Sequence, residues 1–182
     1  DKGIISGYED GSIKPDAPIT RAEFAKIVNK AFGFTEKANI NFTDVKESDW
    51  FYEEVQKAIA AGFMTGYSDT LFGPNDYITR EQVAIILCRL YGLVENLAAA
   101  QGIKDKNNIS SWALGFVGAA YEAGLMKGYE DGSFNPKRNI TRAEAMVALD
   151  RLLELIEEKE EEPEEPEQPE EPEEPEEPEK PD

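Results

Sequence analysis

The chain has 182 residues, of which 40% are hydrophobic, and its formal net charge is −19. Residues 157–182 hold 16 acidic and 2 basic residues, whereas residues 1–156 carry a net charge of only −5. This length and composition predict one packed domain with an acidic tail, and the lack of a basic face argues against a nucleic-acid partner. The sequence has no histidine, the commonest general base and metal ligand, and no run of 18 apolar residues that would predict membrane insertion.

One segment of the chain recurs three times without gaps, which predicts a repeat architecture with a period of about 60 residues. In each copy a glycine precedes an arginine by 14 residues, and in the last two copies a tryptophan precedes that glycine by 16 residues. The copies read GYEDGSIKPDAPITRAEF (7–24), GYSDTLFGPNDYITREQV (66–83) and GYEDGSFNPKRNITRAEA (128–145). The predicted units are a partial repeat at 1–35, full repeats at 40–95 and 101–156, and a linker at 157–182.

The first predicted element along the chain is a turn, which contains Asp10-Gly11 in the first copy and recurs with Asp131-Gly132 in the third. An aspartate that bonds nearby backbone and a glycine with positive φ are typical of turns. A calcium loop is the alternative, but it needs several spaced oxygen ligands, and each loop offers one aspartate nearly alone. The turn is therefore the favoured interpretation.

A long helix follows each turn, and a capping box predicts where it begins. The boxes pair Thr20 with Glu23, Thr79 with Gln82, and Thr141 with Glu144. Each helix continues with an apolar stripe at three- and four-residue steps. The stripes consist of Phe24, Ile27, Val28, Ala31 and Phe32; Val83, Ile86, Leu87, Leu90 and Tyr91; and Met146, Leu149, Leu152, Leu153 and Ile156.

Two shorter amphipathic helices are predicted at residues 50–63 and 112–123, each beginning at a tryptophan. Ser48 or Asp49 is the expected cap of the first, and Ser110 or Ser111 that of the second. Gly62 and Gly124 are expected to end them. The chain is thus predicted to be all-α, with the three long helices packed as a central bundle of pseudo-threefold symmetry.

The C-terminal tail repeats Glu-Glu-Pro from residue 161 onward. Proline interrupts helices and neighbouring carboxylates repel each other, so the tail is predicted to be a disordered, extended spacer. A spacer at the end of a domain predicts a fused cargo domain beyond it; a solvated tail with no task of its own is the alternative.

The recurring tryptophan helix, the Gly-Tyr-x-Asp-Gly-x-Phe-x-Pro turn and the Ile-Thr-Arg-Ala-Glu helix start resemble the S-layer homology repeat of bacterial surface proteins. The resemblance covers most of the chain from Gly3 to about Leu155. It implies a three-repeat helical unit that binds secondary cell-wall polysaccharide, often pyruvylated on N-acetylmannosamine, and that attaches secreted proteins to the cell surface. It implies no cofactor and no catalysis within these residues.

The resemblance also implies which residues bind the ligand. The family's ligand arginine corresponds to Arg21, Arg80 and Arg142, its groove aromatic to Trp50 and Trp112, and its groove glycines to Gly7, Gly66 and Gly128. Pyruvate linked as a ketal presents a carboxylate, which the arginine fork can pair in a bidentate manner. Each arginine is expected at the first helical position, where the positive end of the helix adds a favourable field.

Three expectations follow for individual residues. Each arginine is expected to carry little of the core, so that Arg142→Ala would weaken binding without unfolding the domain. Glu81 is expected to weaken an anion site at Arg80. The grooves of Arg21 and Arg142, each with a neighbouring tryptophan, are therefore favoured as binding sites.

Two alternative functions differ in class from an anchor. A glycosidase needs two carboxylates across a cleft, and although Asp44 and Asp105 recur, no further acid recurs with them as a cluster. A protein-binding solenoid uses concave helix faces and needs no arginine at a repeated helix start. Cys88 lies in an apolar helical run and is interpreted as a core residue.

Overall fold

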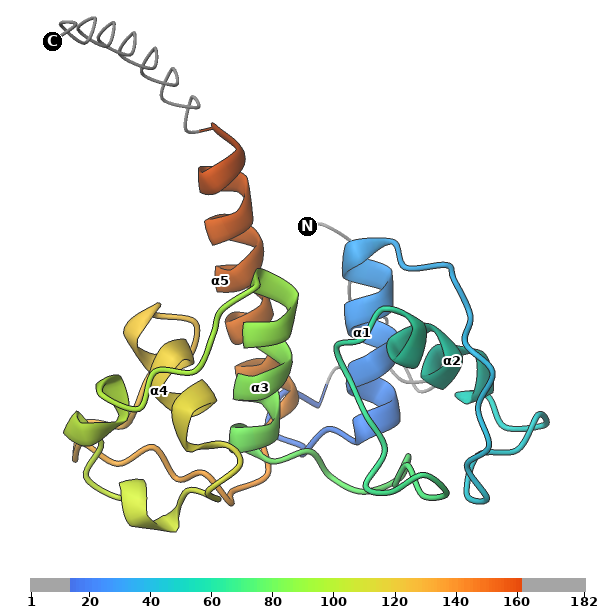
Figure 1. Ribbon diagram of the computed structural model, residues 1–182, viewed down its shortest axis with the longest axis horizontal. Coiled ribbons are helices and arrows are strands. Elements are labelled where there is room, and N and C mark those ends of the chain that lie inside the picture. The colour runs from blue at the N-terminus through green and yellow to red at the C-terminus, as the bar shows by residue number, and fades with distance from the viewer. Residues whose placement is uncertain (1–13, 162–182) are drawn as a thin grey trace, which may run out of the picture.

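The structure is a computed structural model that describes residues 14–161. Within this range the chain consists of helices and loops, and its only extended pairing is three isolated bridges (Figure 1). The all-α prediction is confirmed. The helices are α1 (Arg21–Phe32), α2 (Tyr52–Ala60), α3 (Arg80–Tyr91), η1 (Ala99–Gly102), η2 (Lys106–Asn108), α4 (Leu114–Glu122) and α5 (Arg142–Glu161).

The three long helices α1, α3 and α5 begin as the capping boxes predict. In α1 the Glu23 amide donates to the Thr20 hydroxyl at 3.2 Å, and the Thr20 amide donates to the Glu23 carboxylate at 2.9 Å. The same reciprocal pair forms at Thr79 and at Thr141. Because both partners of each pair satisfy amides that a helix start leaves open, the local sequence fixes all three helix starts.

The two short helices α2 and α4 begin later than predicted, and their predicted caps are wrong. Neither helix has a side-chain cap, since the N-cap residues are Phe51 and Ala113. Asp49 instead accepts from the Lys46 amide, and Ser110 contacts a carboxylate of another repeat. Gly62 and Gly124 follow the helices with φ of +74° and +73°, the left-handed backbone that favours glycine.

A closed ring of backbone hydrogen bonds joins the three repeats just before their long helices. The Ile78 amide donates to the Ile19 carbonyl at 3.0 Å, the Ile140 amide to the Ile78 carbonyl at 3.0 Å, and the Ile19 amide to the Ile140 carbonyl at 3.3 Å. All three isoleucine side chains are fully buried. Each repeat therefore donates to one neighbour and accepts from the other, which confirms the predicted pseudo-threefold arrangement.

The first amides of the long helices also donate from one repeat to another, with the same threefold relation. The Arg21 amide donates to the Asp76 carbonyl, the Arg80 amide to the Arg138 carbonyl and the Arg142 amide to the Ala17 carbonyl, at 2.9–3.0 Å. The next amide of each helix donates to a proline carbonyl in the same neighbouring turn. Together with the capping threonines, these bonds satisfy the first three amides of each long helix.

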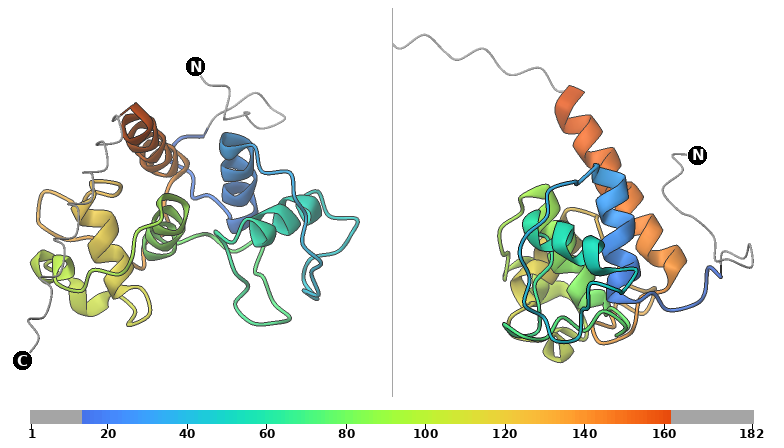
Figure 2. Two further views of the ribbon diagram at one scale, coloured as in Figure 1. Left: turned by 45° about the horizontal axis from the view of Figure 1, so that its top comes forward. Right: turned by 90° about the vertical axis from the view of Figure 1, so that its right-hand side faces the viewer.

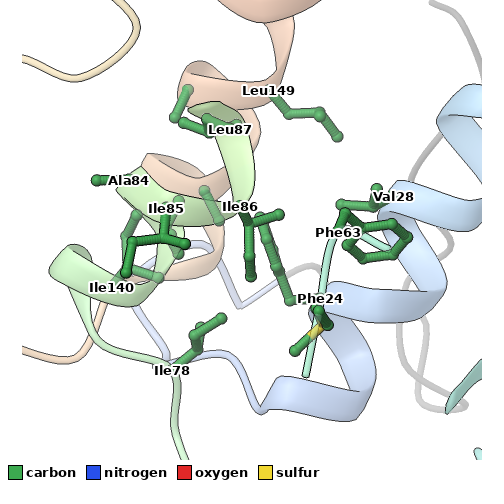
Figure 3. Close-up of a cluster of buried hydrophobic side chains, with 14 of the residues drawn as sticks. Phe24, Val28, Phe63, Ile78, Ala84, Ile85, Ile86, Leu87, Ile140 and Leu149 are labelled. Atoms are coloured by element: carbon green, nitrogen blue, oxygen red, sulfur yellow. The ribbon is translucent and has the colours of Figure 1, made fainter. Parts of the chain in front are cut away.

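The long helices share one apolar core, which lies around the isoleucine ring. Phe24 and Val28 of α1, Ile86 and Leu87 of α3, and Leu149 of α5 gather there (Figure 3). The outer ends of the predicted stripes, such as Phe32 and Tyr91, are only partly buried. Cys88 is fully buried on α3 and its thiol contacts the Phe116 carbonyl, as its interpretation as a core residue requires.

Each short helix covers the long helix of the preceding repeat. Helix α2 packs on α1, and α4 packs on α3, while α5 has no such partner among residues 14–161 (Figures 1 and 2). Helix α5 continues to Glu161, beyond residue 156 where the last repeat was predicted to end. The predicted Glu-Pro spacer and the Asp10-Gly11 turn lie largely or wholly outside the described residues.

Candidate functional site

In the part of the chain that the structure describes, one groove opens beside Arg21 and another beside Arg80, and each is lined by more than one repeat. The Arg21 groove, of about 390 Å³, combines Arg21 at the start of α1 with a loop of the second repeat, one face of α3 and Trp112 of the third repeat. Its lining residues are Arg21, Met64, Thr65, Gly66, Tyr67, Gln82, Ile85, Ile86, Arg89 and Trp112. The structure thus brings together the predicted site residues Arg21, Gly66 and Trp112, one from each repeat.

The Arg80 groove, of about 290 Å³, is the counterpart one repeat further along the chain. Arg80 lies there between the loop that holds Gly128 and the first turns of α5. The lining residues are Arg80, Met126, Lys127, Gly128, Tyr129, Ala143, Glu144, Val147, Ala148 and Arg151. No tryptophan is among them.

The two arginines are held in the same way. The Nε of Arg21 donates to the Phe72 carbonyl at 3.0 Å, and its Nη2 donates to the Thr65 carbonyl at 2.8 Å. The guanidinium carbon lies 4.4 Å from the centre of the Tyr67 ring and 4.8 Å from that of Phe72. These contacts fix the plane of the guanidinium, and among residues 14–161 Nη1 is the guanidinium nitrogen that has no carbonyl partner.

Arg80 repeats this geometry with its own set of partners. Its Nε donates to the Phe134 carbonyl at 2.8 Å, and its Nη2 donates to the Lys127 carbonyl at 2.7 Å. The rings of Tyr129 and Phe134 lie 5.0 and 4.8 Å from the guanidinium carbon. Burial lowers the pKa of both Arg21 and Arg80, and nearby tyrosine and carboxylate groups oppose that shift. Both side chains keep their charge at neutral pH, because the ordinary arginine pKa is so high.

The arginines carry more of the core than expected, which is a correction to the sequence analysis. Arg21, Arg80 and Arg142 are buried residues, only 5, 5 and 7% exposed. They begin their helices, yet each folds inward against its neighbouring repeat instead of extending into solvent. The expectation that each arginine carries little of the core, from which Arg142→Ala was expected to spare the fold, is therefore wrong. The helix amides are also occupied, so that an anion in these grooves meets the guanidinium and no open helix end.

Arg142 and the remaining predicted residues belong to a third position. The Nη1 of Arg142 lies 3.8 Å from the Glu23 carboxylate at the start of α1. Trp50 lies beside the same helix, where the Lys26 ammonium is 5.4 Å from its ring centre. Gly7, the predicted third glycine, lies outside the described residues.

The two tryptophans are surface residues, which favours a ligand platform over a core role. Trp50 is 56% exposed and Trp112 is 55% exposed. Each keeps a lysine near its ring, Lys26 for Trp50 and Lys137 for Trp112. An exposed indole costs free energy in water and gains it when a flat apolar sugar face covers it.

The two groove glycines are required by close packing of the turn. A Cβ at Gly66 would come within 2.6 Å of the Ser68 carbonyl oxygen and 2.7 Å of the Leu71 carbonyl oxygen. A Cβ at Gly128 would come within 2.9 Å of the Ser133 carbonyl oxygen. These contacts involve backbone, which cannot swing aside as a side chain can. Both residues therefore allow the loop to close beneath the groove.

The recurrent acids serve the fold. Asp44 accepts from the amides of Phe72 and Gly73, and Asp105 accepts from those of Phe134 and Asn135, at 2.7–3.0 Å. Each aspartate thus ties the turn of its own repeat. Neither has the free carboxylate that a glycosidase mechanism needs.

Glu81 also serves the fold, and it does not act as expected. Its side chain is 3% exposed and accepts from the Ser110 amide and hydroxyl and from the Lys137 ammonium. Lys137, in the loop before α5, neutralises this carboxylate, and Ser110, in the loop before α4, holds it in place. The acid that does approach Arg80 is Glu144, whose Oε1 lies 4.0 Å from Nη1.

Sequence reasoning missed three classes of groove residue. The tyrosines Tyr67 and Tyr129 cover the arginines, the capping residues Gln82 and Glu144 line the grooves, and so do Arg89 and Arg151. A signal existed for the tyrosines and the capping residues, because both recur at fixed positions of every repeat. Their roles in the turn and in the cap concealed the second role.

Two classes of feature are absent from residues 14–161. No group of three or more acidic or cysteine side chains is placed to hold a metal ion. The third-repeat turn is instead closed by Asp131, which accepts from the Ser133 amide at 3.0 Å, with Gly132 at a φ of +82°. No helix of this part of the chain has the length and apolar character needed to cross a bilayer.

Comparison with known proteins shows which family the chain resembles. The family model described as the S-layer homology domain matches residues 1–25, 41–84 and 102–146. Exoglucanase XynX of Acetivibrio thermocellus is 36% identical over 83% of the chain and 14% of its own length. The surface-layer 125 kDa protein of Lysinibacillus sphaericus is 32% identical over 85% of the chain and 13% of its own length.

A third relative is named for anchoring itself. The cellulosome-anchoring protein of Acetivibrio thermocellus is 32% identical over 83% of the chain and 35% of its own length. The chain therefore spans about a third or less of the curated relatives it matches here. The three matched segments fall within the three repeats recognised in the sequence, and such domains are non-catalytic modules of the cell surface. The chain belongs to the S-layer homology domain family.

Proposed function

We propose that the chain is an anchor that binds a secondary cell-wall polysaccharide, and that pyruvylated N-acetylmannosamine is the sugar recognised. The observation that carries this proposal is a buried guanidinium with one nitrogen left over, in a groove that also contains an exposed tryptophan. A pyruvate ketal supplies the carboxylate for the guanidinium, and the hexose ring supplies a face for the indole.

The physical basis is preorganisation. The carbonyls of Phe72 and Thr65 and the rings of Tyr67 and Phe72 hold the Arg21 guanidinium before any ligand arrives. Little side-chain entropy is then lost on binding. A charge-assisted hydrogen bond in a half-enclosed groove is also stronger than one at an open surface.

We further propose that the chain anchors a larger protein. It spans 14% of a relative named as an exoglucanase and 35% of one named as a cellulosome-anchoring protein, so the same module occurs beside different partners. The Glu-Pro sequence that follows α5 would separate the anchor from its cargo, as the sequence analysis predicts. An enzymatic activity of the whole protein would then lie in the cargo.

A sedimentation assay with purified cell-wall sacculi tests the proposal. The chain is expected to pellet with native sacculi, to bind less after the pyruvate ketals are removed by mild acid, and to stay in solution after the polysaccharide is stripped. Binding of the chain to sacculi that have lost their polysaccharide but keep their proteins would instead favour a protein-binding repeat. Failure to bind sacculi that retain their polysaccharide would contradict the anchoring proposal.

A further inference from the structure

The third residues of α3 and α5, Gln82 and Glu144, complete a capping box and also line a groove. Both cap their helices in the same way, but they present different atoms to the two grooves. Gln82 Oε1 accepts from the Thr79 amide at 3.0 Å, and Glu144 Oε2 accepts from the Thr141 amide at 3.0 Å. Each cap uses one terminal atom of the side chain. The other terminal atom is therefore an N–H donor in Gln82 and a carboxylate oxygen in Glu144.

In the Arg80 groove the second carboxylate oxygen of Glu144 faces the guanidinium of Arg80. Glu144 Oε1 lies 4.0 Å from Arg80 Nη1, accepts from the Tyr129 hydroxyl at 3.2 Å, and pairs with Arg138. The nitrogen that Arg80 leaves over thus already faces a carboxylate. A ligand carboxylate entering beside it would meet like charge and would have to displace these bonds.

In the Arg21 groove the corresponding atoms are available. Within residues 14–161, Arg21 has no ion pair inside 4.0 Å and the Gln82 Nε2 makes no hydrogen bond. The acids that favour the charged form of Arg21 are Asp76 and Asp44, and both lie beyond ion-pair distance. Asp44 is already held by two backbone amides.

At the equivalent side-chain position, therefore, the Arg21 groove has the N–H donor of Gln82 and the Arg80 groove has a carboxylate oxygen of Glu144. The described lining of the Arg21 groove contains Arg21, Gln82 and Arg89 and no carboxylate, whereas that of the Arg80 groove contains Glu144. We propose that Gln82 makes the Arg21 groove the primary site for the carboxylate of the sugar, and that Glu144 closes the Arg80 groove to it. This inference rests on the proposed function and assigns its specificity to the capping residue.

A matched pair of substitutions tests the proposal with little risk to the fold. Glutamine and glutamate both complete the capping box in this chain, so Gln82→Glu and Glu144→Gln each install a side chain that the same cap already accepts. Unchanged circular dichroism spectra and thermal midpoints within a few degrees would verify folding. The ligand probe is the methyl glycoside of 4,6-O-pyruvylated N-acetylmannosamine, titrated calorimetrically against the full chain.

The wild-type chain is expected to show one dominant site, and Gln82→Glu is expected to weaken it about tenfold or more. Glu144→Gln is expected to add a second site. In the double variant the site should move, so that ligand no longer perturbs the indole resonance of Trp112, which lines only the Arg21 groove of the two.

Two results separate failure of this inference from failure of the proposed function. Equal affinity and stoichiometry in the wild type and in Gln82→Glu would overturn the assignment to Gln82 while leaving the anchoring function intact. A wild-type chain that binds neither the glycoside nor pyruvylated sacculi would contradict the anchoring function, and this inference with it.

Discussion

The Arg21 groove and the Arg80 groove are built from the same parts, yet they differ at the atoms a ligand would meet first. Both hold an arginine against two carbonyls and two aromatic rings. Only the first has an exposed tryptophan and an uncharged capping residue. The shared contacts maintain the fold, so the differences are where binding preference can vary without loss of stability.

The largest expected effect comes from removing a shared part. Arg21→Ala leaves the carbonyls of Phe72 and Thr65 without their donors and opens space between two rings. We expect a loss of about 3 kcal/mol in the free energy of unfolding, measured by urea denaturation. Arg80→Ala should lose a similar amount, since it removes equivalent bonds. A change below about 1 kcal/mol in both variants would show that the arginines are not structural.

The glycines allow a sharper comparison of the two grooves. Gly66→Ala places a Cβ within 2.7 Å of two backbone carbonyl oxygens, whereas Gly128→Ala meets one at 2.9 Å. We expect Gly66→Ala to destabilise the fold by about 2 kcal/mol and Gly128→Ala by less. Urea denaturation of both variants checks the order. The reverse order would mean that the second-repeat loop relaxes more easily than its packing indicates.

The tryptophans separate binding from stability. Trp112 is 55% exposed and lines the Arg21 groove, so Trp112→Ala should weaken binding of the pyruvylated glycoside about tenfold with little change in stability. Trp50→Ala is the matched control, because its indole is equally exposed but lies beside α1 and Lys26. Calorimetric titration should show a smaller loss for Trp50→Ala. Equal losses would place the sugar at more than one groove.

The smallest expected effect is a pH dependence confined to the Arg80 groove. Burial tends to raise the pKa of Glu144, but the Thr141 amide and Arg138 outweigh it and hold that pKa below its ordinary value. A carboxyl with a lowered folded-state pKa stabilises the fold above its unfolded pKa, and this contribution disappears as pH falls through the folded pKa. The stability difference between the wild type and Glu144→Gln should therefore shrink from pH 6 to pH 3.

Thermal unfolding at several pH values measures this difference. Gln82→Glu is the informative counterpart, because it adds a titrating carboxyl near Arg21 where the wild type has none at that position. A stability difference for Glu144→Gln that stays constant between pH 6 and pH 3 would contradict the lowered pKa.

The sequence predicted those parts of the structure that depend on local contacts. The capping boxes at Thr20, Thr79 and Thr141 use residues three apart, and the glycine-to-arginine spacing reports a repeat directly. The inward fold of the arginines depends on carbonyls 44 to 54 residues away, which no local pattern reveals. The combination of Arg21, Gly66 and Trp112 in one groove likewise depends on the rotation between repeats.

The predicted cap of α4 failed for a related reason. Ser110 has a favourable cap residue type, but its hydroxyl and amide are taken by Glu81 of the neighbouring repeat. A tertiary contact to a buried carboxylate outweighs a solvent-exposed cap, because an unpaired buried charge costs more free energy than an uncapped helix start.

The circle of amides and carbonyls that joins Ile19, Ile78 and Ile140 limits how this domain can be shortened or extended. In an open-ended stack a terminal copy can be deleted and the remainder still folds, because each copy contacts only its neighbours. Here, deletion of any one copy would leave a donor and an acceptor unmet in the fully buried centre, and a fourth copy would find no vacant link. The domain should consequently unfold in a single cooperative step, and its number of copies is set by geometry.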